Sequence, residues 1–285
     1  MKIALTAEST IDLPKNLLQK YNIITVPFYI SLGDDLVKDE EGISAQIFDY
    51  VARTKQLPKT SAINRMEYEE FFCGLKQEYD AIIHISLSSG LSSAFENALA
   101  VSSGMTDVYV IDSKQLSTGI ALLALYAREL IDSNKDIKEI VDLLNKKVPQ
   151  IQTGFILENL HYLYKGGRCS AMAKFGANLL KIKPQIAMFD GKLDMKRKFV
   201  GPMHKVAEKY FEALMQDYPN PDLKYVFITH SSEMPEITAY LTQKLKERGF
   251  QTVYDTFANG TISSHCGPDC IGILFDGGDT TSVRN

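Results

Sequence analysis

Long apolar runs are missing from this chain, and their absence argues against a membrane-spanning protein. A helix that crosses a bilayer needs roughly 20 consecutive apolar residues, and no uninterrupted run in the sequence approaches that length. The apolar segment that precedes Glu8 is also too short for a secretion signal. We therefore expect a cytoplasmic protein without a membrane span, whose contact with a membrane is at most transient.

Cysteines are few and do not show the spacing of a disulfide framework. They stand at Cys73, Cys169, Cys266 and Cys270. Reduced thiols are therefore expected. His265 stands beside a Cys-x3-Cys pair, but this pair has no second pair nearby and is a weak signal for zinc. The sequence predicts no metal site.

An excess of positive charge is absent as well. The formal net charge is -4, and the densest basic clusters, at 146–147 and 196–198, are short. A nucleic-acid partner is therefore not expected. Hydrophobic residues make up 45% of the chain and no low-complexity tract interrupts it, which predicts a fully folded globular protein.

Strand-like and helix-like segments alternate over residues 1–152. Short runs rich in β-branched residues are expected as strands, with helices between them, in the order strand 1–6, helix 15–21, strand 22–32, helix 43–51, helix 67–72, strand 81–85, helix from about 92, strand 107–112 and helix 117–130. Pro27 argues that the second strand is an edge or is bent. This alternation predicts a doubly wound parallel sheet.

Residues 153–285 have a different pattern and are expected to form a mixed α+β domain. Asp190-Gly191 lies between two strand-like runs, at 184–189 and 192–199, which is a strong hairpin signal. Helices are predicted at 206–218 and 237–248, with strands at 153–157, 225–229, 252–257 and 270–275. The whole chain is thus predicted to be an α/β protein of two domains, with the boundary after residue 152.

A serine-rich turn follows the predicted strand 81–85. Five serines and Gly90 fall within residues 86–93, and a helical pattern begins near Ser92. The free N–H groups and the positive dipole end of a helix N-terminus, together with serine hydroxyls, can bind an anion. An ordinary serine N-cap surrounded by flexible serines remains the alternative interpretation.

Two further hydroxyl pairs lie near predicted element ends. Ser9 and Thr10 follow the first strand, at the sheet edge where open α/β sheets bind ligands. Thr60 and Ser61 stand just ahead of a helix, and taken alone this pair is better explained as a simple N-terminal turn.

Several short polar motifs occur along the chain in a defined order. They are Ser9-Thr10-x-Asp12-Leu13-Pro14, Thr60-Ser61, Ser88-Ser89-Gly90-Leu91-Ser92, Ile111-Asp112-Ser113-Lys114-Gln115 with Gly119, Lys165-Gly166-Gly167-Arg168, Asp190-Gly191-Lys192 and His265-x-Gly267-Pro268. In this order they resemble the DegV family of fatty-acid-binding proteins along nearly the whole chain.

The resemblance implies a long-chain fatty acid held in a buried tunnel between two α/β domains. Its carboxylate is expected to bind Ser92, the backbone N–H of Ser93, and Thr60 or Ser61, with His265 closing the site from the second domain. The fatty acid is the only ligand that the resemblance implies: no cofactor and no catalytic residue are expected. In organisms that have a fatty acid kinase, family members present the bound acid for phosphorylation.

Physical chemistry agrees with these expectations. A carboxylate removed from water needs replacement hydrogen bonds, which a helix N-terminus with hydroxyls supplies. A fully buried acyl chain gains about 0.8 kcal/mol per CH₂, so the hydrocarbon dominates the affinity. By resemblance, Arg168 and Arg197 lie on the face that would meet the kinase; ordinary solvated arginines are the alternative.

Two other functions compete with lipid binding. A serine hydrolase would use Ser92 as nucleophile, His265 as base and Asp112 as orienting acid, but no Gly-x-Ser-x-Gly elbow surrounds Ser92. A phosphate-binding module would use the same helix N-terminus, but neither a Gly-x4-Gly-Lys-Ser/Thr loop nor a Gly-x-Gly-x-x-Gly motif after a strand is present. A non-catalytic lipid-binding protein is the favoured prediction.

Overall fold

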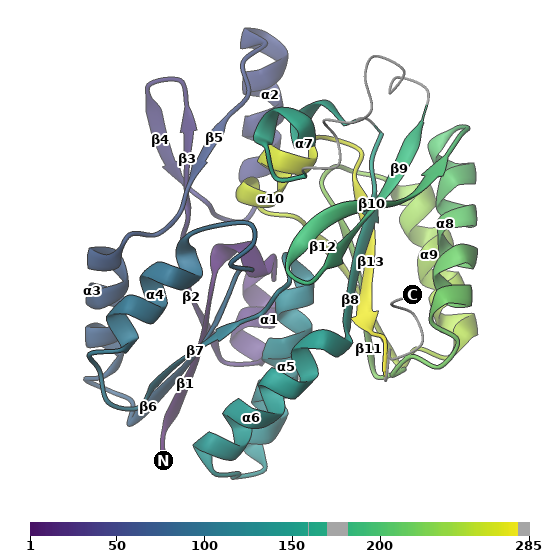
Figure 1. The fold of residues 1–285 in the computed structure, drawn as a ribbon. Helices are drawn as coiled ribbons and strands as arrows, with labels where there is room; N and C mark the ends of the chain where they lie inside the picture. The colour runs from purple at the N-terminus through teal and green to yellow at the C-terminus, as the bar shows by residue number, and fades with distance from the viewer. Residues whose placement is uncertain (159, 170–181, 279–285) are drawn as a thin grey trace.

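The computed structural model describes residues 1–158, 160–169 and 182–278. Its strands form three sheets, of four, six and three strands, and helices cover the sheets (Figure 1). The mixed α/β class predicted from the sequence is confirmed, with a parallel sheet in the first half and a mixed sheet in the second. Among the described residues, no helix combines the length and apolarity that a bilayer span requires.

The first half is built on a parallel sheet with the order β2-β1-β6-β7. Its strands are β1 (Ile3–Glu8), β2 (Ile23–Val26), β6 (Ala81–Ser86) and β7 (Val108–Asp112). Every residue of β1 and β6 is buried, which explains why these strands appear in the sequence as continuous apolar runs.

Helices on both faces bury this sheet. In Figure 1, α3 (Arg65–Leu75) and α4 (Ala94–Ser102) lie on one side of it, and α5 (Thr118–Asp132) and α6 (Ile137–Lys147) lie on the other. The short helix α1 (Lys15–Lys20) connects β1 to β2 after the 3-10 turn η1 (Ser9–Ile11). The doubly wound arrangement follows from these crossovers.

The second half is built on a six-stranded sheet with the order β10-β9-β8-β13-β11-β12. Its strands are β8 (Ile151–Ile156), β9 (Lys183–Phe189), β10 (Lys192–Phe199), β11 (Tyr225–His230), β12 (Thr252–Phe257) and β13 (Ile271–Asp276). Only β11 and β12 pair in parallel. The predicted hairpin joins β9 and β10 through Asp190 and Gly191, which have φ values of 45° and 80°, as a type I′ turn requires.

A small third sheet, β4-β3-β5, corrects two predictions for the first half. The expected strand 22–32 is two strands, β2 and β3 (Tyr29–Leu32), which belong to different sheets. Pro27 lies between them, and because proline has no N–H to donate it interrupts the ladder. The expected turn at Thr60-Ser61 is instead strand β5 (Lys59–Ser61), which pairs with β3. The remaining strand, β4 (Asp35–Lys38), forms a hairpin with β3 ahead of α2 (Ile43–Thr54).

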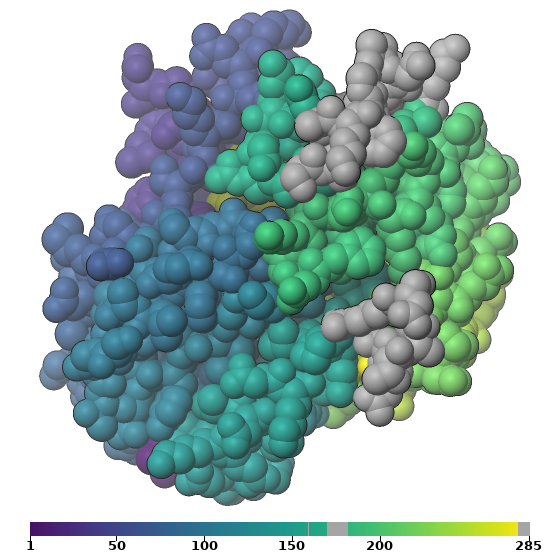
Figure 2. Space-filling model, in the orientation of Figure 1, coloured from purple at the N-terminus to yellow at the C-terminus, as the bar shows by residue number. Residues whose placement is uncertain are grey.

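Helix α5 lies between the two large sheets. It contacts β1 and β6 of the first and β8, β11 and β13 of the second, and most of its residues are buried. The largest apolar core therefore contains side chains of both halves. A second core lies on the other face of the six-stranded sheet, under α8 (Met203–Asp217) and α9 (Pro235–Arg248). The space-filling view shows the two halves in broad contact (Figure 2). The predicted boundary after residue 152 falls within β8 and stays a prediction.

Candidate functional site

A cavity with a volume of about 310 Å³ lies between the two halves. Its wall is mainly apolar, and both halves contribute to it. The apolar side chains in the wall include Phe28, Leu87, Leu91, Leu116, Phe155, Leu163, Leu193, Ile262 and Leu274, and the polar residues include Thr60, Ser92, Ser93, Ser117, Arg168, Thr229 and His265. An elongated apolar molecule with one polar group matches such a wall.

The serine-rich turn lies where β6 ends and α4 begins. The carbonyl of Ser88 accepts hydrogen bonds from the N–H groups of Leu91 and Ser92, at 2.9 and 3.3 Å, and these bonds close the turn. The Ser92 hydroxyl accepts from the N–H of Ala94 at 3.2 Å, and Ser93 is the N-cap residue of α4. Ser92 and Ser93 therefore stand at the helix N-terminus and line the cavity, as predicted.

Thr60 and His265 meet at the cavity wall from opposite halves of the chain. The Thr60 Oγ1 on β5 lies 2.8 Å from the Nε2 of His265, near the C-terminus of α10 (Gly260–Cys266). The Nδ1 of His265 is buried and has no hydrogen-bond partner among the described residues. Burial, and then the nearby Arg168 guanidinium, lower the pKa of His265 to about 4. The imidazole is therefore neutral at pH 7.

Of the two alternatives Thr60 and Ser61, the position of the side chains favours Thr60, and the role of either residue in binding stays a prediction. The Ser61 side chain is exposed and does not line the cavity, whereas Thr60 does. Successive side chains on a strand point to opposite faces, and both residues lie on β5. Thr60 faces the cavity, so Ser61 faces away from it.

The two predicted arginines have different surroundings. Arg168 follows the short helix α7 (His161–Gly166), is exposed, lines the cavity, and donates from Nη1 to the Gly166 carbonyl at 2.6 Å. Arg197 on β10 does not line the cavity. It is half-buried in a bidentate ion pair with Asp217, at 2.6 and 2.5 Å. Whether either arginine meets a partner protein stays a prediction.

Two buried carboxyl groups of the first half hold the helix that carries His265. Asp39 accepts a hydrogen bond from the N–H of Thr261 at 3.2 Å, and Asp12 accepts from the N–H of Asn259 at 2.8 Å. Asp12 also accepts from the Ser117 hydroxyl at 2.5 Å. Burial raises the pKa of both carboxyls, for Asp12 well above its ordinary value. Both act in place of an N-cap for α10, whose own Asn259 makes no side-chain cap bond.

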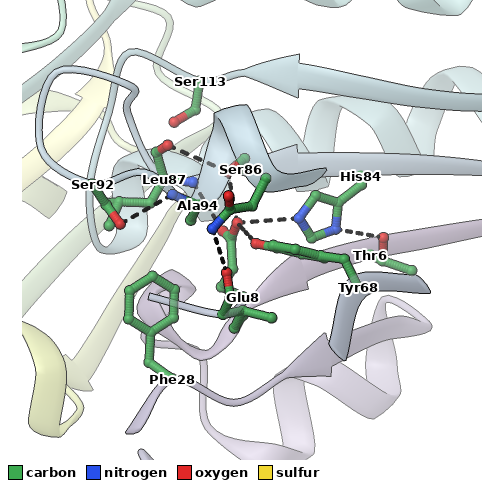
Figure 3. Close-up of polar contacts among 12 residues, drawn as sticks. Thr6, Glu8, Phe28, Tyr68, His84, Ser86, Leu87, Ser92, Ala94 and Ser113 are labelled. Atoms are coloured by element: carbon green, nitrogen blue, oxygen red, sulfur yellow. Dashed lines mark hydrogen bonds and ion pairs between the residues drawn. The ribbon is translucent and has the colours of Figure 1, made fainter. Parts of the chain in front are cut away.

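A third buried carboxyl group, Glu8 at the end of β1, lies beneath the serine-rich turn (Figure 3). It accepts hydrogen bonds from Tyr68, Ser86 and the N–H of Leu87, and it pairs with His84. This network was not predicted from the sequence, because Glu8 and His84 are far apart in the chain and lie in segments whose other residues are typical of core strands. A charged residue at the end of a buried strand was the available signal.

The triad required by the hydrolase alternative is not assembled in the described residues. Asp112 accepts from the Ser89 hydroxyl at 2.5 Å and pairs with Lys114 at 2.9 Å. The hydrogen bond of His265 goes to Thr60 instead. The described residues also contain no group of three histidine, cysteine or acidic side chains that could hold a metal ion. Cys266 and Cys270 are thiols in the cavity wall.

Comparison with known proteins places the chain in a family. Residues 2–277 match the family described as "Uncharacterised protein, DegV family". The chain is 28% identical over 281 residues to a protein of Thermotoga maritima named "Fatty acid-binding protein", covering 95% of this chain and 96% of that one. The crystal structure of a DegV lipid-binding protein from Thermotoga maritima superposes with a TM-score of 0.87 and 27% identity, covering 97% of this chain and 98% of that one.

The crystal structure of DegV from Bacillus subtilis, described as a fatty-acid-binding protein, has a TM-score of 0.84 and 25% identity, covering 96% of this chain and 98% of that one. The mixed α/β fold, with its parallel sheet and its mixed sheet, agrees with these matches. The chain belongs to the DegV family.

Proposed function

We propose that this protein binds a long-chain fatty acid in the cavity between its halves and presents it, without catalysis, to a fatty acid kinase in the cytoplasm. The observation that carries the proposal is the meeting of Ser92, Ser93, Thr60 and His265 at the wall of an otherwise apolar cavity. A fatty acid has this combination of one carboxylate and a long hydrocarbon. The names of the family relatives described above support the same ligand class.

The carboxylate would be bound mainly by uncharged donors. The Ser92 hydroxyl and free N–H groups in the first turn of α4 are available at the cavity wall. Thr60 and the neutral imidazole of His265 are hydrogen-bonded to each other, so this pair can offer one further donor to the ligand. Hydrogen bonds from such groups replace those that the carboxylate loses on leaving water. Arg168 is exposed at the cavity wall and points its Nη1 to a carbonyl of its own loop, so it would add positive charge at the opening.

Protein purified without added lipid is expected to carry a long-chain fatty acid. Each methylene that the apolar wall removes from water contributes about 0.8 kcal/mol to the binding free energy. A fatty acid of ordinary chain length should therefore stay bound during purification. Mass spectrometry of denatured, solvent-extracted protein would identify the ligand. The proposal would be wrong if the extracts contained no fatty acid and the purified protein bound neither palmitic nor oleic acid on titration.

Fatty acid binding is expected to strengthen as the pH falls from 8 to 5. In the free protein the pKa of His265 is about 4, and a carboxylate bound beside the ring favours the imidazolium form and raises that pKa. The complex therefore holds more protons than the free protein between pH 4 and the raised pKa. Titration calorimetry in two buffers of different protonation enthalpy at pH 6 should detect proton uptake on binding.

The matched control for this pH dependence is His265→Gln, which keeps a hydrogen-bonding group of similar size but cannot titrate. The variant should bind the fatty acid without any uptake of a proton by the side chain at position 265. Equal proton uptake in the variant and the wild type would assign the proton to the ligand or to another group.

A further inference from the structure

The buried Glu8 carboxylate has polar partners at both of its oxygens and contacts Leu87 of the cavity wall, yet it does not line the cavity itself. Its Oε1 accepts from the Ser86 hydroxyl at 2.6 Å and from the Tyr68 hydroxyl at 2.7 Å, and lies 3.1 Å from the Nε2 of His84. Its Oε2 accepts from the backbone N–H of Leu87 at 2.8 Å. Figure 3 shows these groups converging on the carboxylate from β6, from α3 and from the turn.

The donors keep this carboxylate ionised although no water reaches it. Burial acts to raise the pKa of Glu8, but the attraction of His84 and the hydrogen bonds from His84, Ser86 and Tyr68 outweigh it, so the pKa lies below its ordinary value. A buried charge satisfied in this way is costly to move, since any displacement leaves it without partners. The Glu8 carboxylate is therefore held in one position at the C-terminal edge of the parallel sheet.

The hydrogen bond from the Leu87 N–H connects the Glu8 carboxylate to the serine-rich turn. Leu87 is the first residue after β6, and its side chain lines the cavity. The next residue, Ser88, donates from its N–H to the Gln115 carbonyl at 3.0 Å, and its own carbonyl closes the turn that carries Ser92. The direction in which the chain leaves β6 thus determines where the Ser92 hydroxyl and the first free amides of α4 lie.

We propose that Glu8 is a positioning residue: by holding the Leu87 amide it sets the orientation of residues 87–93 and so the preference of the site for a carboxylate over an uncharged head group. The inference rests on the proposed fatty acid site and adds to it a residue that does not touch the ligand. Because the Leu87 N–H is occupied by Glu8, the amides offered to the ligand must come from the later part of the turn.

The test measures dissociation constants for palmitic acid and for 1-hexadecanol, which share a hydrocarbon chain and differ in the head group. In Glu8→Gln the negative charge is lost and an amide NH₂ replaces one acceptor oxygen. In one orientation the NH₂ faces the Leu87 N–H; in the other it faces the Ser86 and Tyr68 hydroxyls, which would have to accept instead of donate. We expect the affinity for palmitic acid to fall about tenfold, the size of effect seen when one hydrogen bond to a charged group is lost. The affinity for hexadecanol should change less than twofold, so that the acid-to-alcohol preference falls.

Tyr68→Phe is the matched control, because it removes one donor to Glu8 and leaves the Leu87 bond in place. Its acid-to-alcohol preference should equal that of the wild type. Glu8→Asp provides a second variant if Glu8→Gln does not fold: it keeps the charge but is one methylene too short to reach Leu87, and the preference should fall as well. Folded Glu8 variants with an unchanged preference would overturn the inference, whereas failure of the wild type to bind palmitic acid would overturn the proposed function instead.

Discussion

Replacing both Ser92 and His265 by alanine is expected to weaken binding of a long-chain fatty acid at least about 100-fold. Each side chain is proposed to donate a hydrogen bond to the carboxylate, and a hydrogen bond to a charged group contributes about 1.5–3 kcal/mol. Two such losses together correspond to about two orders of magnitude or more in the dissociation constant. The hydrocarbon wall stays intact, so residual binding should remain. Fluorescence displacement or calorimetry with palmitic acid would measure the change.

Ser61→Ala is the matched control for this experiment. Ser61 lies next to Thr60 on β5 but is exposed on the other side of the strand, so its removal should leave the dissociation constant unchanged. Because the Ser92 hydroxyl accepts from the N–H of Ala94, the double variant also loses this hydrogen bond at the start of α4, at a cost of about 0.5–1.5 kcal/mol. Circular dichroism should confirm that it stays folded. Unchanged affinity in a folded double variant would mean that the carboxylate binds elsewhere.

Among small substitutions in the serine-rich turn, Gly90→Ala is expected to lower the stability of the protein most. A Cβ at this position would lie 2.3 Å from the carbonyl oxygen of Gly191, at the tip of the β9–β10 hairpin. The same carbonyl accepts the Ser88 hydroxyl at 2.7 Å, so hairpin and turn would have to separate. We expect the free energy of unfolding to fall by about 1–3 kcal/mol, as in other overpacked sites, together with weaker fatty acid binding. Urea denaturation would measure the first effect.

Gly74→Ala provides the comparison for this prediction. Gly74 lies in helix α3, and a Cβ there would meet nothing within 4 Å. Alanine is favoured over glycine by about 0.5–1 kcal/mol in a helix interior. Because Gly74 is the penultimate residue of α3, only part of this difference applies, and the variant should be as stable as the wild type or slightly more stable. Equal stability of both variants would show that the hairpin adapts to the added methyl group without cost.

The elements of the fold were largely predictable because local patterns determine them. The buried strands β1 and β6 are continuous apolar runs, and the hairpin at Asp190-Gly191 has the residues that its turn requires. The small sheet was missed because β5 has only three residues and no apolar periodicity. What makes it a strand is its pairing with β3, a contact between distant parts of the chain.

The site was predictable only as far as single segments allow. Ser92 and Ser93 were found from the local strand–turn–helix pattern, whereas the resemblance to the family was needed to connect Thr60 with His265 across the chain. Asp39 and Glu8 were missed because their roles lie in partners far away in sequence, Thr261 and Leu87. Thr60 and Ser61 had to remain alternatives, because a hydroxyl pair does not reveal which member faces inward until the strand is known.

Helix α5 has a consequence for how a lipid could enter. This helix packs against the apolar faces of both large sheets. Separating the two halves would therefore expose one side of α5, and much of the main core, to water. Such a separation would cost far more free energy than the displacement of a short segment of the cavity wall. We therefore expect loading and release to proceed through local motions that leave the packing of both sheets against α5 unchanged.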